Sequence, residues 1–429
     1  MVTGQPSLSL PPSLWASTAP AGPSCPALDS DVSTDVAVIG AGFTGLSTAL
    51  HLAAKSVSVR VIEAGEPGWG ASGRNGGQVN PGWYISPDRI RALYGADHAD
   101  RVLDAVAGAC DRVFDLIERH HMDCEAVRPG YIQGVRGAGG SGIIDSKIRQ
   151  WSMLGAPVEF LDKKDMDRLT GTRAYLCGML DKRGGNLNPL AYARGLARAA
   201  ISAGAHVHGQ SRVMTVVKHA DGYRVETERG SVRASRVVFA TNAYTDGAWP
   251  GLRQSVVPVA SVIAATEPLS DDAIAGILPW RHAVSETARV FYYYKRDAHG
   301  RFLIGCKGPA FAAPDADRAL RGRAAAERFF PSLNGVRWEY GWGGYVAVTP
   351  DMRPRLMQLA PGVTAALGYQ GRGVAMATEM GYELAEQLTG GDARIPVSGI
   401  RRVPFHWLSR PAVFARILGG RFLDRVRPI

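Results

Sequence analysis

The sequence predicts an α/β fold, or α+β when the whole chain is considered, and three observations support this prediction. The chain has 429 residues, a length that suggests two or three domains of roughly 100–200 residues each. Residues 35–63 have the pattern of strand, helix and strand, which is typical of a βαβ unit with parallel strands. Later segments are short or alternate between apolar and polar residues, as in an antiparallel sheet.

The βαβ unit begins with a short, nearly all-apolar run at residues 35–39. Such a run suits a parallel strand that is buried on both of its faces. Residues 46–54 carry apolar side chains on one helical face, and residues 57–62 form a second strand that is followed by Glu63. We expect these elements at the centre of the first domain.

The other expected elements follow from the same periodicities. Residues 1–30 are rich in Pro, Ser and Ala and should form an irregular arm that Trp15 anchors. The expected helices are 100–119, 190–203 and 374–388, and the expected strands are 213–217, 223–227, 231–240, 291–294, 302–305, 341–349 and 363–367.

The net charge of +10 is concentrated at the C-terminal end, where residues 401–429 hold seven Arg and one acid, Asp424. Aromatic and aliphatic residues lie between these arginines. Two hypotheses remain open: a helix that packs on the body with its arginines in water, or a basic amphipathic tail on an anionic membrane. No nucleic-acid partner is expected, because the tail lacks a recognised binding module.

Several protein classes do not fit the composition. No window holds the ~18 apolar residues that a membrane span needs, and the first basic residue, Lys55, lies too late for a signal peptide. The five cysteines contain no CxxC pair, so neither a disulfide framework nor a zinc ribbon is expected. His120 and His121 near Cys124 point different ways on a helix, so no metal site is expected. We expect a cytoplasmic protein, with peripheral contact to the inner membrane as the alternative.

The segment 40–45, GAGFTG, matches G-x-G-x-x-G in the right context: it follows a buried strand, opens a helix and precedes an acid by 18 residues. Gly40 would allow the tight turn, Gly42 the approach of a pyrophosphate, and Gly45 close packing of helix on strand. Glu63 would accept hydrogen bonds from a ribose diol and would repel the 2′-phosphate of NADP. The predicted contacts here are Gly40, Gly42, Phe43, Thr44, Gly45, Glu63 and Ala64.

Residues 68–78, GWGASGRNGGQ, which we call the glycine-rich loop, contain too much glycine for a helix or a strand. Their many N–H groups and polar side chains would suit a planar polar ring, so we interpret the loop as the cradle of a flavin ring. An ordinary surface loop is the alternative. The predicted contacts are Ala71, Ser72, Arg74, Asn75, Gly76, Gly77 and Gln78.

A second match to the glycine pattern, at residues 137–142, needs separate treatment. The preceding strand, 131–136, contains Gln133 and Arg136 and should therefore be half-exposed rather than buried in a parallel sheet. A second dinucleotide site is not expected.

Together with these motifs, several further runs carry a family resemblance: PSLWAST at 12–18, NLNPLAYARGLARAA at 186–200, EYGWGGYVAVTPDMRP at 339–354 and GYQGRGVAMATEMG at 368–381. From about residue 12 onward the chain resembles the FAD-dependent D-amino-acid oxidase, glycine oxidase and sarcosine oxidase group. Within this group the sequence most resembles the bacterial γ-glutamylputrescine oxidase branch, and it resembles L-pipecolate oxidase nearly as closely.

The resemblance implies a Rossmann-like FAD-binding domain of the glutathione-reductase type and a substrate domain with an antiparallel or mixed sheet. The FAD domain would comprise residues 31–88, 186–250 and 341–396, and the substrate domain 89–185 and 251–340, with 397–429 as a basic tail. The implied further cofactor contacts are Val213 at the adenine end, Ala240, Thr241 and Asn242 beside the pyrophosphate, and Gly371, Arg372, Gly373 and Val374 at the pyrimidine edge of the flavin. A helix N-terminus there would stabilise negative charge on the reduced flavin.

Departures from the family pattern bear on the cofactor. Residues 343–345 contain no cysteine and residues 61–80 no histidine, so the resemblance implies FAD that is bound non-covalently. The oxygen-activating lysine that sarcosine oxidases carry near the position of Leu303 is missing, which leaves the oxygen reaction open.

The activity that the resemblance implies is hydride transfer from the carbon that bears an amine to flavin N5, followed by hydrolysis of the imine and reduction of O₂ to H₂O₂. The flavin carries the chemistry, so no side chain is named as catalytic. Pocket candidates are Tyr293, Lys295, Trp342, Tyr345 and Tyr369; each aromatic ring could instead be core, and Lys295 could be a solvated strand end rather than a partner of a substrate carboxylate. Two alternatives remain: a membrane-associated FAD-dependent amino-acid dehydrogenase that reduces quinone, and a non-catalytic NAD-binding redox sensor.

Overall fold

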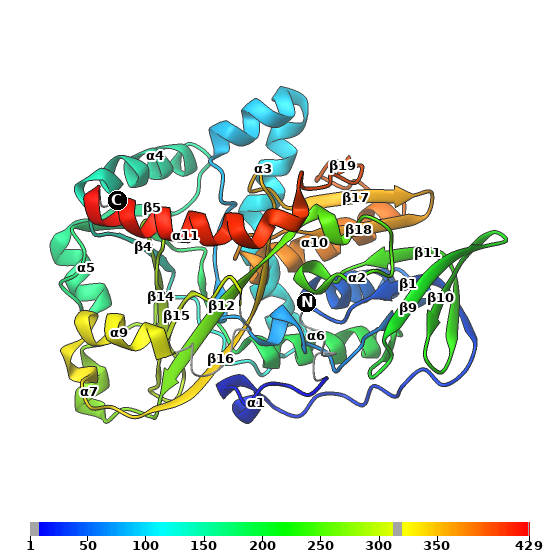
Figure 1. Ribbon diagram of the computed structural model, residues 1–429, viewed down its shortest axis with the longest axis horizontal. Coiled ribbons are helices and arrows are strands. Elements are labelled where there is room, and N and C mark those ends of the chain that lie inside the picture. The colour runs from blue at the N-terminus through cyan, green and yellow to red at the C-terminus, as the bar shows by residue number, and fades with distance from the viewer. Residues whose placement is uncertain (1–7, 312–319, 428) are drawn as a thin grey trace.

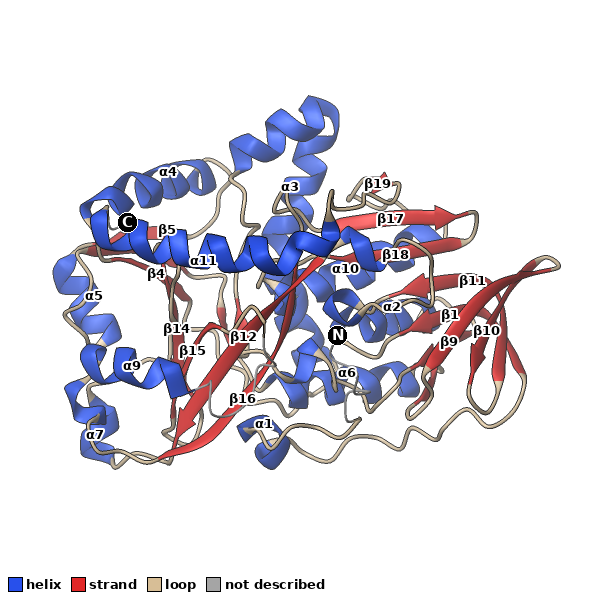
Figure 2. Ribbon diagram, viewed as in Figure 1, coloured by secondary structure: helices blue, strands red, loops and turns tan. Residues whose placement is uncertain are grey.

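The computed structural model describes residues 8–311, 320–427 and 429. Two large β-sheets occupy different halves of the molecule (Figures 1 and 2). The first sheet has the order β19 (Val397–Ser398), β17 (Arg355–Ala360), β18 (Val363–Leu367), β11 (Ser231–Phe239), β1 (Val32–Ile39), β2 (Val59–Ile62) and β8 (His206–His208), and β10 (Gly222–Thr227) and β9 (Val213–His219) extend it from β11. The second has the order β16 (Trp338–Val348), β12 (Val257–Thr266), β15 (Phe302–Lys307), β14 (Tyr293–Arg296), β13 (Ala283–Glu286), β4 (Tyr131–Val135), β6 (Cys177–Asp181) and β5 (Val158–Leu161).

The first sheet is parallel at its centre, where β1 pairs with β2 and β11, and β11 with β18. The four central residues 36–39 of β1 are all buried, as the apolar run predicts. Two helices, α2 (Phe43–Ala53) and α10 (Gly373–Leu388), pack against each other, and α2 also packs on α6 (Pro189–Ser202). The predicted α/β class with a Rossmann-like first domain is confirmed.

The second sheet is mixed: β12 pairs antiparallel with β15 and β16, whereas β13 pairs parallel with β4. Short helices border it, namely α4 (Ser141–Ser152), α5 (Lys163–Thr170), α7 (Asp271–Ala275) and α9 (Arg323–Phe329) (Figure 1). The domain boundaries stay a prediction. The strand at 338–348 pairs in this second sheet although the division from the sequence gives most of it to the first domain, and β19 at 397–398 pairs in the first sheet.

Two predictions about local structure differ from what is observed. All five residues of β4 are buried, so the expectation of a half-exposed strand at 131–136 is wrong, because Gln133 Oε1 accepts a hydrogen bond from Lys147 Nζ at 2.6 Å and can therefore be buried. The helix expected at 100–119 begins earlier, since α3 (Pro87–Arg119) is capped by Ser86 and has a kink at Gly95, where φ is 69°.

Residues 137–142, the second glycine pattern, lie against the C-terminal end of the chain. An ideal Cβ at Gly140 would lie 2.8 Å from the carbonyl carbon of Ile429. The strand before this loop, β4, belongs to the mixed sheet and pairs antiparallel with β6. The absence of a side chain at Gly140 thus leaves room for the backbone of Ile429.

The N-terminal arm contains one short helix, α1 (Leu14–Thr18), in which Trp15 is 1% exposed. Trp15 Nε1 donates to the carbonyl of Asn75 in the glycine-rich loop, and the end of this loop forms a two-stranded sheet, β3 (Gln78–Val79) with β7 (Gly185–Asn186), that joins it to the segment before α6. The arm is therefore fixed to the protein at the glycine-rich loop rather than at a distant surface.

The basic tail folds into α11 (Ser409–Val426), which crosses one face of the second half of the molecule (red in Figure 1). Only Ile417 and Gly420 of this helix are buried, and Asp424 accepts hydrogen bonds from the backbone of Arg289 and Val290. Among the described residues, no helix is long and apolar enough to cross a membrane. The hypothesis of a packed helix is thus correct for the backbone, although large apolar side chains stay exposed.

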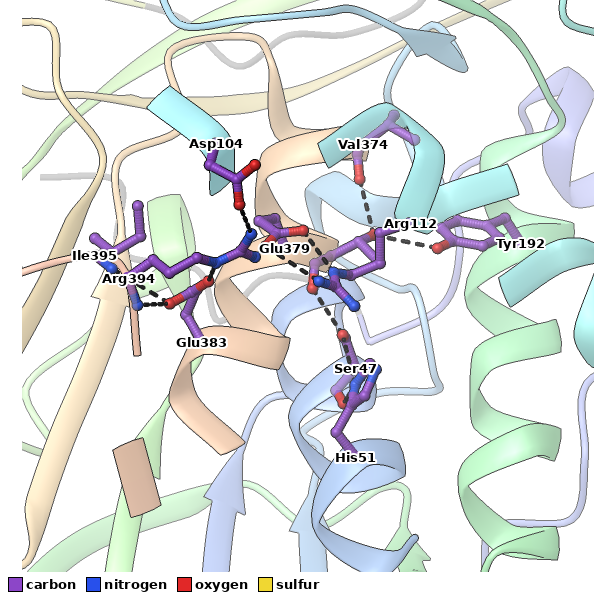
Figure 3. Close-up of polar contacts among 11 residues, drawn as sticks. Ser47, His51, Asp104, Arg112, Tyr192, Val374, Glu379, Glu383, Arg394 and Ile395 are labelled. Atoms are coloured by element: carbon purple, nitrogen blue, oxygen red, sulfur yellow. Dashed lines mark hydrogen bonds and ion pairs between the residues drawn. The ribbon is translucent and has the colours of Figure 1, made fainter. Parts of the chain in front are cut away.

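A network of ion pairs holds the middle of α10 against α3 (Figure 3). Glu379, whose side chain is 1% exposed, accepts hydrogen bonds from Arg112 Nε at 2.5 Å and from Arg394. Glu383 accepts from Arg394 Nε at 2.9 Å, and Asp104 from Arg394 Nη1 at 2.6 Å. Burial raises the pKa of Glu379, and the two arginines oppose that rise.

Replacement of Glu379 by Gln should lower the free energy of unfolding by about 3 kcal/mol, because Arg112 and Arg394 lose their shared counter-charge. Denaturant unfolding of the protein measures this change in free energy. The control is Lys55→Gln, which breaks the exposed pair with Glu386 and should cost less than about 1 kcal/mol. Equal losses in the two variants would contradict the assignment.

Candidate cofactor and substrate site

The turn between β1 and α2 requires glycine at two of the predicted positions. Gly40 has φ of +103°, and an ideal Cβ there would lie 3.1 Å from the carbonyl oxygen of Ala240. An ideal Cβ at Gly45 would lie 1.9 Å from the carbonyl oxygen of Gly40. A side chain at Gly45 would therefore force the helix away from the strand, as expected for a dinucleotide-binding turn.

Gly42 and Ser72 form a small cradle at the start of α2. The Phe43 N–H donates to Ser72 Oγ at 3.0 Å, and an ideal Cβ at Gly42 would lie 2.8 Å from the same oxygen. Gly42 gives the helix no side-chain cap, so the N–H groups of the first turn after Phe43 can bind an anion. The glycine-rich turn and its N–H donors fit a pyrophosphate.

Glu63 lies buried at the end of β2, where its carboxylate accepts hydrogen bonds from the N–H groups of Ala41 (2.7 Å) and Gly65 (2.9 Å). Burial raises the pKa of Glu63, and these backbone donors oppose the rise. The Ser211 N–H donates to the Glu63 carbonyl at 2.8 Å, which brings the strand that begins at Val213 to the same end of the sheet. Ala64 is half-buried beside it.

Asn242 joins two of the predicted contact segments. It has φ of +44°, and its Oδ1 accepts a hydrogen bond from the Gly368 N–H at 2.9 Å. The Ala240 N–H donates to the Ile39 carbonyl at 2.9 Å, and Thr241 Oγ1 bonds to Thr245 Oγ1 at 2.7 Å. The turn at 240–242 therefore lies directly beside the β1–α2 turn.

Within the glycine-rich loop, Asn75 holds the backbone in shape. Its Nδ2 donates to the carbonyls of Ala71 and Ser72, and its Oδ1 accepts from the Gly77 N–H at 2.8 Å. Gly77 has φ of +70°, and an ideal Cβ there would lie 2.1 Å from the Leu187 carbonyl oxygen. The side chain of Asn75 is thus used within the loop, where it holds the backbone around Gly77 in place.

Two side chains from outside the loop bind its backbone, and the side chain of its last residue, Gln78, joins the loop to the second sheet. Trp342 Nε1 donates to the Arg74 carbonyl at 2.9 Å, and Trp15 Nε1 donates to the Asn75 carbonyl at 2.8 Å. Gln78 Nε2 donates to the carbonyls of Val284 and Tyr294, at 3.1 and 3.0 Å. The loop therefore joins the arm, the first domain and the second sheet.

Lys295 and Tyr293 of β14 lie against this loop. Lys295 is 3% exposed, donates to the Leu187 carbonyl at 2.7 Å and lies 4.9 Å from the ring centroid of Trp15. Burial lowers the pKa of Lys295 to about 7. The Tyr293 ring covers Gly305, and an ideal Cβ at Gly76 would lie 3.0 Å from it. Lys295 is therefore not a solvated strand end, and its ammonium already has a partner.

The other aromatic candidates lie in different surroundings. Trp342 is 1% exposed and packs on Trp15, and Tyr369 is 3% exposed, with its hydroxyl 2.6 Å from Thr44 Oγ1. These contacts favour packing roles for both. Tyr345 is half-buried, and its N–H donates to the hydroxyl of Tyr244 at 3.3 Å. Tyr293 and Tyr345 are both half-buried, so they stay the candidates for the wall of the substrate pocket.

The start of α10 has the strained backbone expected of a tight loop before a helix. Gln370 and Gly371 have φ of +53° and +80°, and α10 begins at Gly373 with Arg372 as its N-cap residue. Arg372 is 8% exposed, and Val374 is buried. The first N–H groups of α10 have no side-chain cap, so they can face the negative edge of a reduced ring.

Sequence patterns missed the anchoring of the loop by Trp15 and Gln78, and they missed Tyr84, Tyr131 and Lys147 near Arg372. These residues come from segments far apart in the chain, so no local spacing could reveal the contacts. Only the Trp15 anchor had a signal, because it is the one large residue of a polar arm.

Substitution of Gly42 by Ala should reduce the affinity for FAD at least about tenfold, because the methyl group occupies the space of the pyrophosphate. Fluorescence titration of apoprotein with FAD measures the affinity. The double variant Gly42→Ala, Ser72→Ala removes the clash within the protein and should still bind weakly. Gly108→Ala, at a glycine with no atom within 4 Å of an ideal Cβ, serves as control, and full recovery in the double variant would contradict the prediction.

Solved structures share the fold of this chain. Glycine oxidase from Geobacillus kaustophilus aligns with a TM-score of 0.72 and 22% sequence identity over 86% of this chain and 99% of its own. L-Proline dehydrogenase from P. horikoshii aligns with a TM-score of 0.70 and 20% identity over 85% of this chain and 96% of its own.

Curated relatives and a family model identify the chain at the level of sequence. Gamma-glutamylputrescine oxidoreductase of Escherichia coli (strain K12) is 32% identical over 88% of this chain and 91% of its own length, and a probable oxidoreductase, OrdL, of Haemophilus influenzae is 30% identical over 91% and 88%. The family model described as DAO, FAD dependent oxidoreductase, matches residues 35–387. FAD is thereby confirmed as the cofactor, and the NAD-binding sensor is excluded. The chain belongs to the DAO family of FAD-dependent oxidoreductases.

Proposed function

We propose that this enzyme oxidises the carbon–nitrogen bond of an amine or amino acid. The observation that carries the proposal is the glycine-rich loop, which is held between the dinucleotide turn of the first domain and β14 of the second sheet. The similarity of the whole chain to an Escherichia coli protein that is named for γ-glutamylputrescine supports an amine substrate. The residues fit FAD, because Gly40, Gly42 and Gly45 form a turn that larger residues would fill.

When bound, FAD supplies an acceptor for a hydride from the carbon that bears the nitrogen. The protein contributes binding and orientation. The N–H groups of Thr44 and Gly45 would hold the pyrophosphate, Glu63 the ribose, and the glycine-rich loop the ring. Tyr293 and Tyr345 offer an aromatic and poorly hydrated wall, which favours the neutral form of a substrate amine and so exposes its lone pair.

The attachment and the reoxidation of FAD complete the proposal. We propose that FAD is bound non-covalently, because residues 343–345 and 61–80 offer no cysteine or histidine. We propose O₂ as electron acceptor, with H₂O₂ as product. The competing acceptor is a quinone, and the fold does not choose between them, since an oxidase and a dehydrogenase share it.

Anaerobic mixing of the enzyme with a panel of amines should bleach the flavin absorbance with at least one member. The panel comprises γ-glutamylputrescine, L-pipecolate, D-alanine and sarcosine. Admission of air should then restore the colour and yield one H₂O₂ for each turnover. Bleaching by none of these compounds would argue against amine oxidation, whereas bleaching without H₂O₂ would favour the dehydrogenase.

We further propose that α11 and the segment before it contact an anionic lipid surface, in an enzyme that otherwise lies in the cytoplasm. Large apolar side chains are exposed there: Phe405 at 72%, Trp407 at 77%, Phe422 at 65% and Val426 at 60%. All seven arginines of residues 401–429 are also exposed, so charge complementarity favours anionic lipid over a second copy of this basic chain.

Sedimentation with vesicles tests the lipid contact. The enzyme should bind vesicles that contain about 30% phosphatidylserine and should be released by salt, because each arginine near the surface adds roughly 1 kcal/mol. Trp407→Ser with Phe422→Ser should weaken binding, whereas the control Met153→Ser, at a residue 75% exposed elsewhere, should not. Equal binding to neutral vesicles, or a dimer that the double variant dissolves, would contradict the proposal.

A further inference from the structure

Arg372 is a buried cation without a counter-charge. It is 8% exposed, and among the described residues it forms no ion pair with a carboxylate. Its Nη1 donates to the Pro81 carbonyl oxygen, and its Nε is buried with no hydrogen-bond partner. A buried guanidinium with an unused donor is unfavourable unless a ligand completes it.

The free donors of Arg372 have a geometry that suits a carboxylate. Because Nη1 is taken by Pro81, the edge of the guanidinium that carries Nε and Nη2 remains without a protein acceptor among the described residues. Two parallel N–H groups on one edge match the two oxygens of a carboxylate. A lysine at this position could not offer this fork.

Lys147 of α4 brings a second cation to the same place. Its only hydrogen-bond acceptor among the described residues is Gln133 Oε1, at 2.6 Å, and it forms no ion pair with them. Burial and the nearby charge of Arg372 lower the pKa of Lys147 to about 7. An anion between the two cations would relieve their repulsion and restore the charge on Lys147.

Two tyrosines border this pair of cations and provide access. The guanidinium carbon of Arg372 lies 5.5 Å from the ring centroid of Tyr84 and 5.6 Å from that of Tyr131. Tyr131 is fixed by a hydrogen bond between its hydroxyl and Ser285. Tyr84 is 41% exposed, so a ligand can reach the site from solvent past its ring.

Lys295, the cation that the sequence favours as partner of a substrate carboxylate, is already engaged. Its ammonium binds the Leu187 carbonyl and faces Trp15 under the loop. Arg372 instead lies at the start of α10, next to the predicted edge of the flavin, and its side chain points to β4 and α4 of the second sheet.

We propose that Arg372 and Lys147 form the subsite that binds a carboxylate of the substrate, and that Tyr84 and Tyr131 line its entrance. This inference rests on the proposed function and narrows the substrate class. The preferred amines carry a carboxylate, and Arg372 grips it with Nε and Nη2 while Lys147 neutralises it from the opposite side.

Binding of unreactive probes to the FAD-loaded enzyme tests the subsite without turnover. Isothermal calorimetry and the perturbation of flavin absorbance should show that glutarate binds at least about tenfold more tightly than the neutral glutaramide. Arg372→Gln should abolish this preference, and Lys147→Met should reduce it several-fold. Arg149→Gln, an exposed cation on the same helix as Lys147, should retain it.

Matched substrates provide the second measurement, in which L-pipecolate is compared with piperidine and γ-glutamylputrescine with N-(4-aminobutanoyl)putrescine, each pair differing only in the carboxylate. The carboxylate should lower the concentration for half-maximal anaerobic bleaching in the wild type and should lower it by a several-fold smaller factor in Lys147→Met, a variant that keeps Arg372 and its bond to Pro81. Bleaching of the flavin with no preference for carboxylates would overturn the subsite and leave the proposed oxidation intact. Glutarate binding that depends on Arg372, without bleaching by any amine, would support the anion site and defeat the proposed oxidation. If Arg372→Gln changes FAD affinity or flavin potential and leaves the glutarate preference unchanged, Arg372 serves the flavin and the inference falls.

Discussion

The backbone of residues 74–78 is the constraint on which the site depends. This stretch contains two adjacent glycines, so its conformation depends on hydrogen bonds from Asn75 within the loop and from side chains outside it. Two indole N–H groups take the carbonyls of Arg74 and Asn75, and the Gln78 amide binds two carbonyls of the second sheet. Buried donors that bind carbonyls in this way are costly to leave unpaired, which holds the loop in one place.

The second constraint is the direction of α10. Its first turn ends a strained loop with positive φ at Gln370 and Gly371, while its middle is tied to α3 by Glu379 and its two arginines. Because α10 is fixed at its centre, the position of its N-terminus is also fixed. The N–H groups of that end and the guanidinium of Arg372 therefore arrive together, one beside the predicted flavin edge and the other beside the second sheet.

The turn between β1 and α2 could be predicted from the sequence, whereas the contacts between the glycine-rich loop and the second sheet could not. Gly40, Gly42, Gly45 and Glu63 are close in the chain and perform backbone tasks that only particular residues allow, so spacing alone identifies them. The burial of β4 could not be predicted in this way, because the hydrogen bond from Lys147 that lets Gln133 be buried comes from another element. The burial of Lys295 could not be predicted for the same reason: a lysine near a strand end suggests contact with solvent, yet its partner Leu187 lies 108 residues away in sequence.

Two buried cations thus lie on the second-domain side of the loop, and their partners separate their roles. The ammonium of Lys295 donates to the Leu187 carbonyl and faces the ring of Trp15, so its partners are all supplied by the protein. Within the part of the chain that the structure describes, Arg372 binds one carbonyl and its Nε has no acceptor, so its donors are satisfied only in part. Both cations are buried, but they differ in how many of their N–H donors have an acceptor. A buried donor without an acceptor is unfavourable for folding, so the cation that keeps one is the better candidate for binding a ligand. By that criterion the charge that selects a substrate lies at the start of α10, at the boundary between the two sheets, where a bound molecule can reach both the carboxylate grip and the flavin.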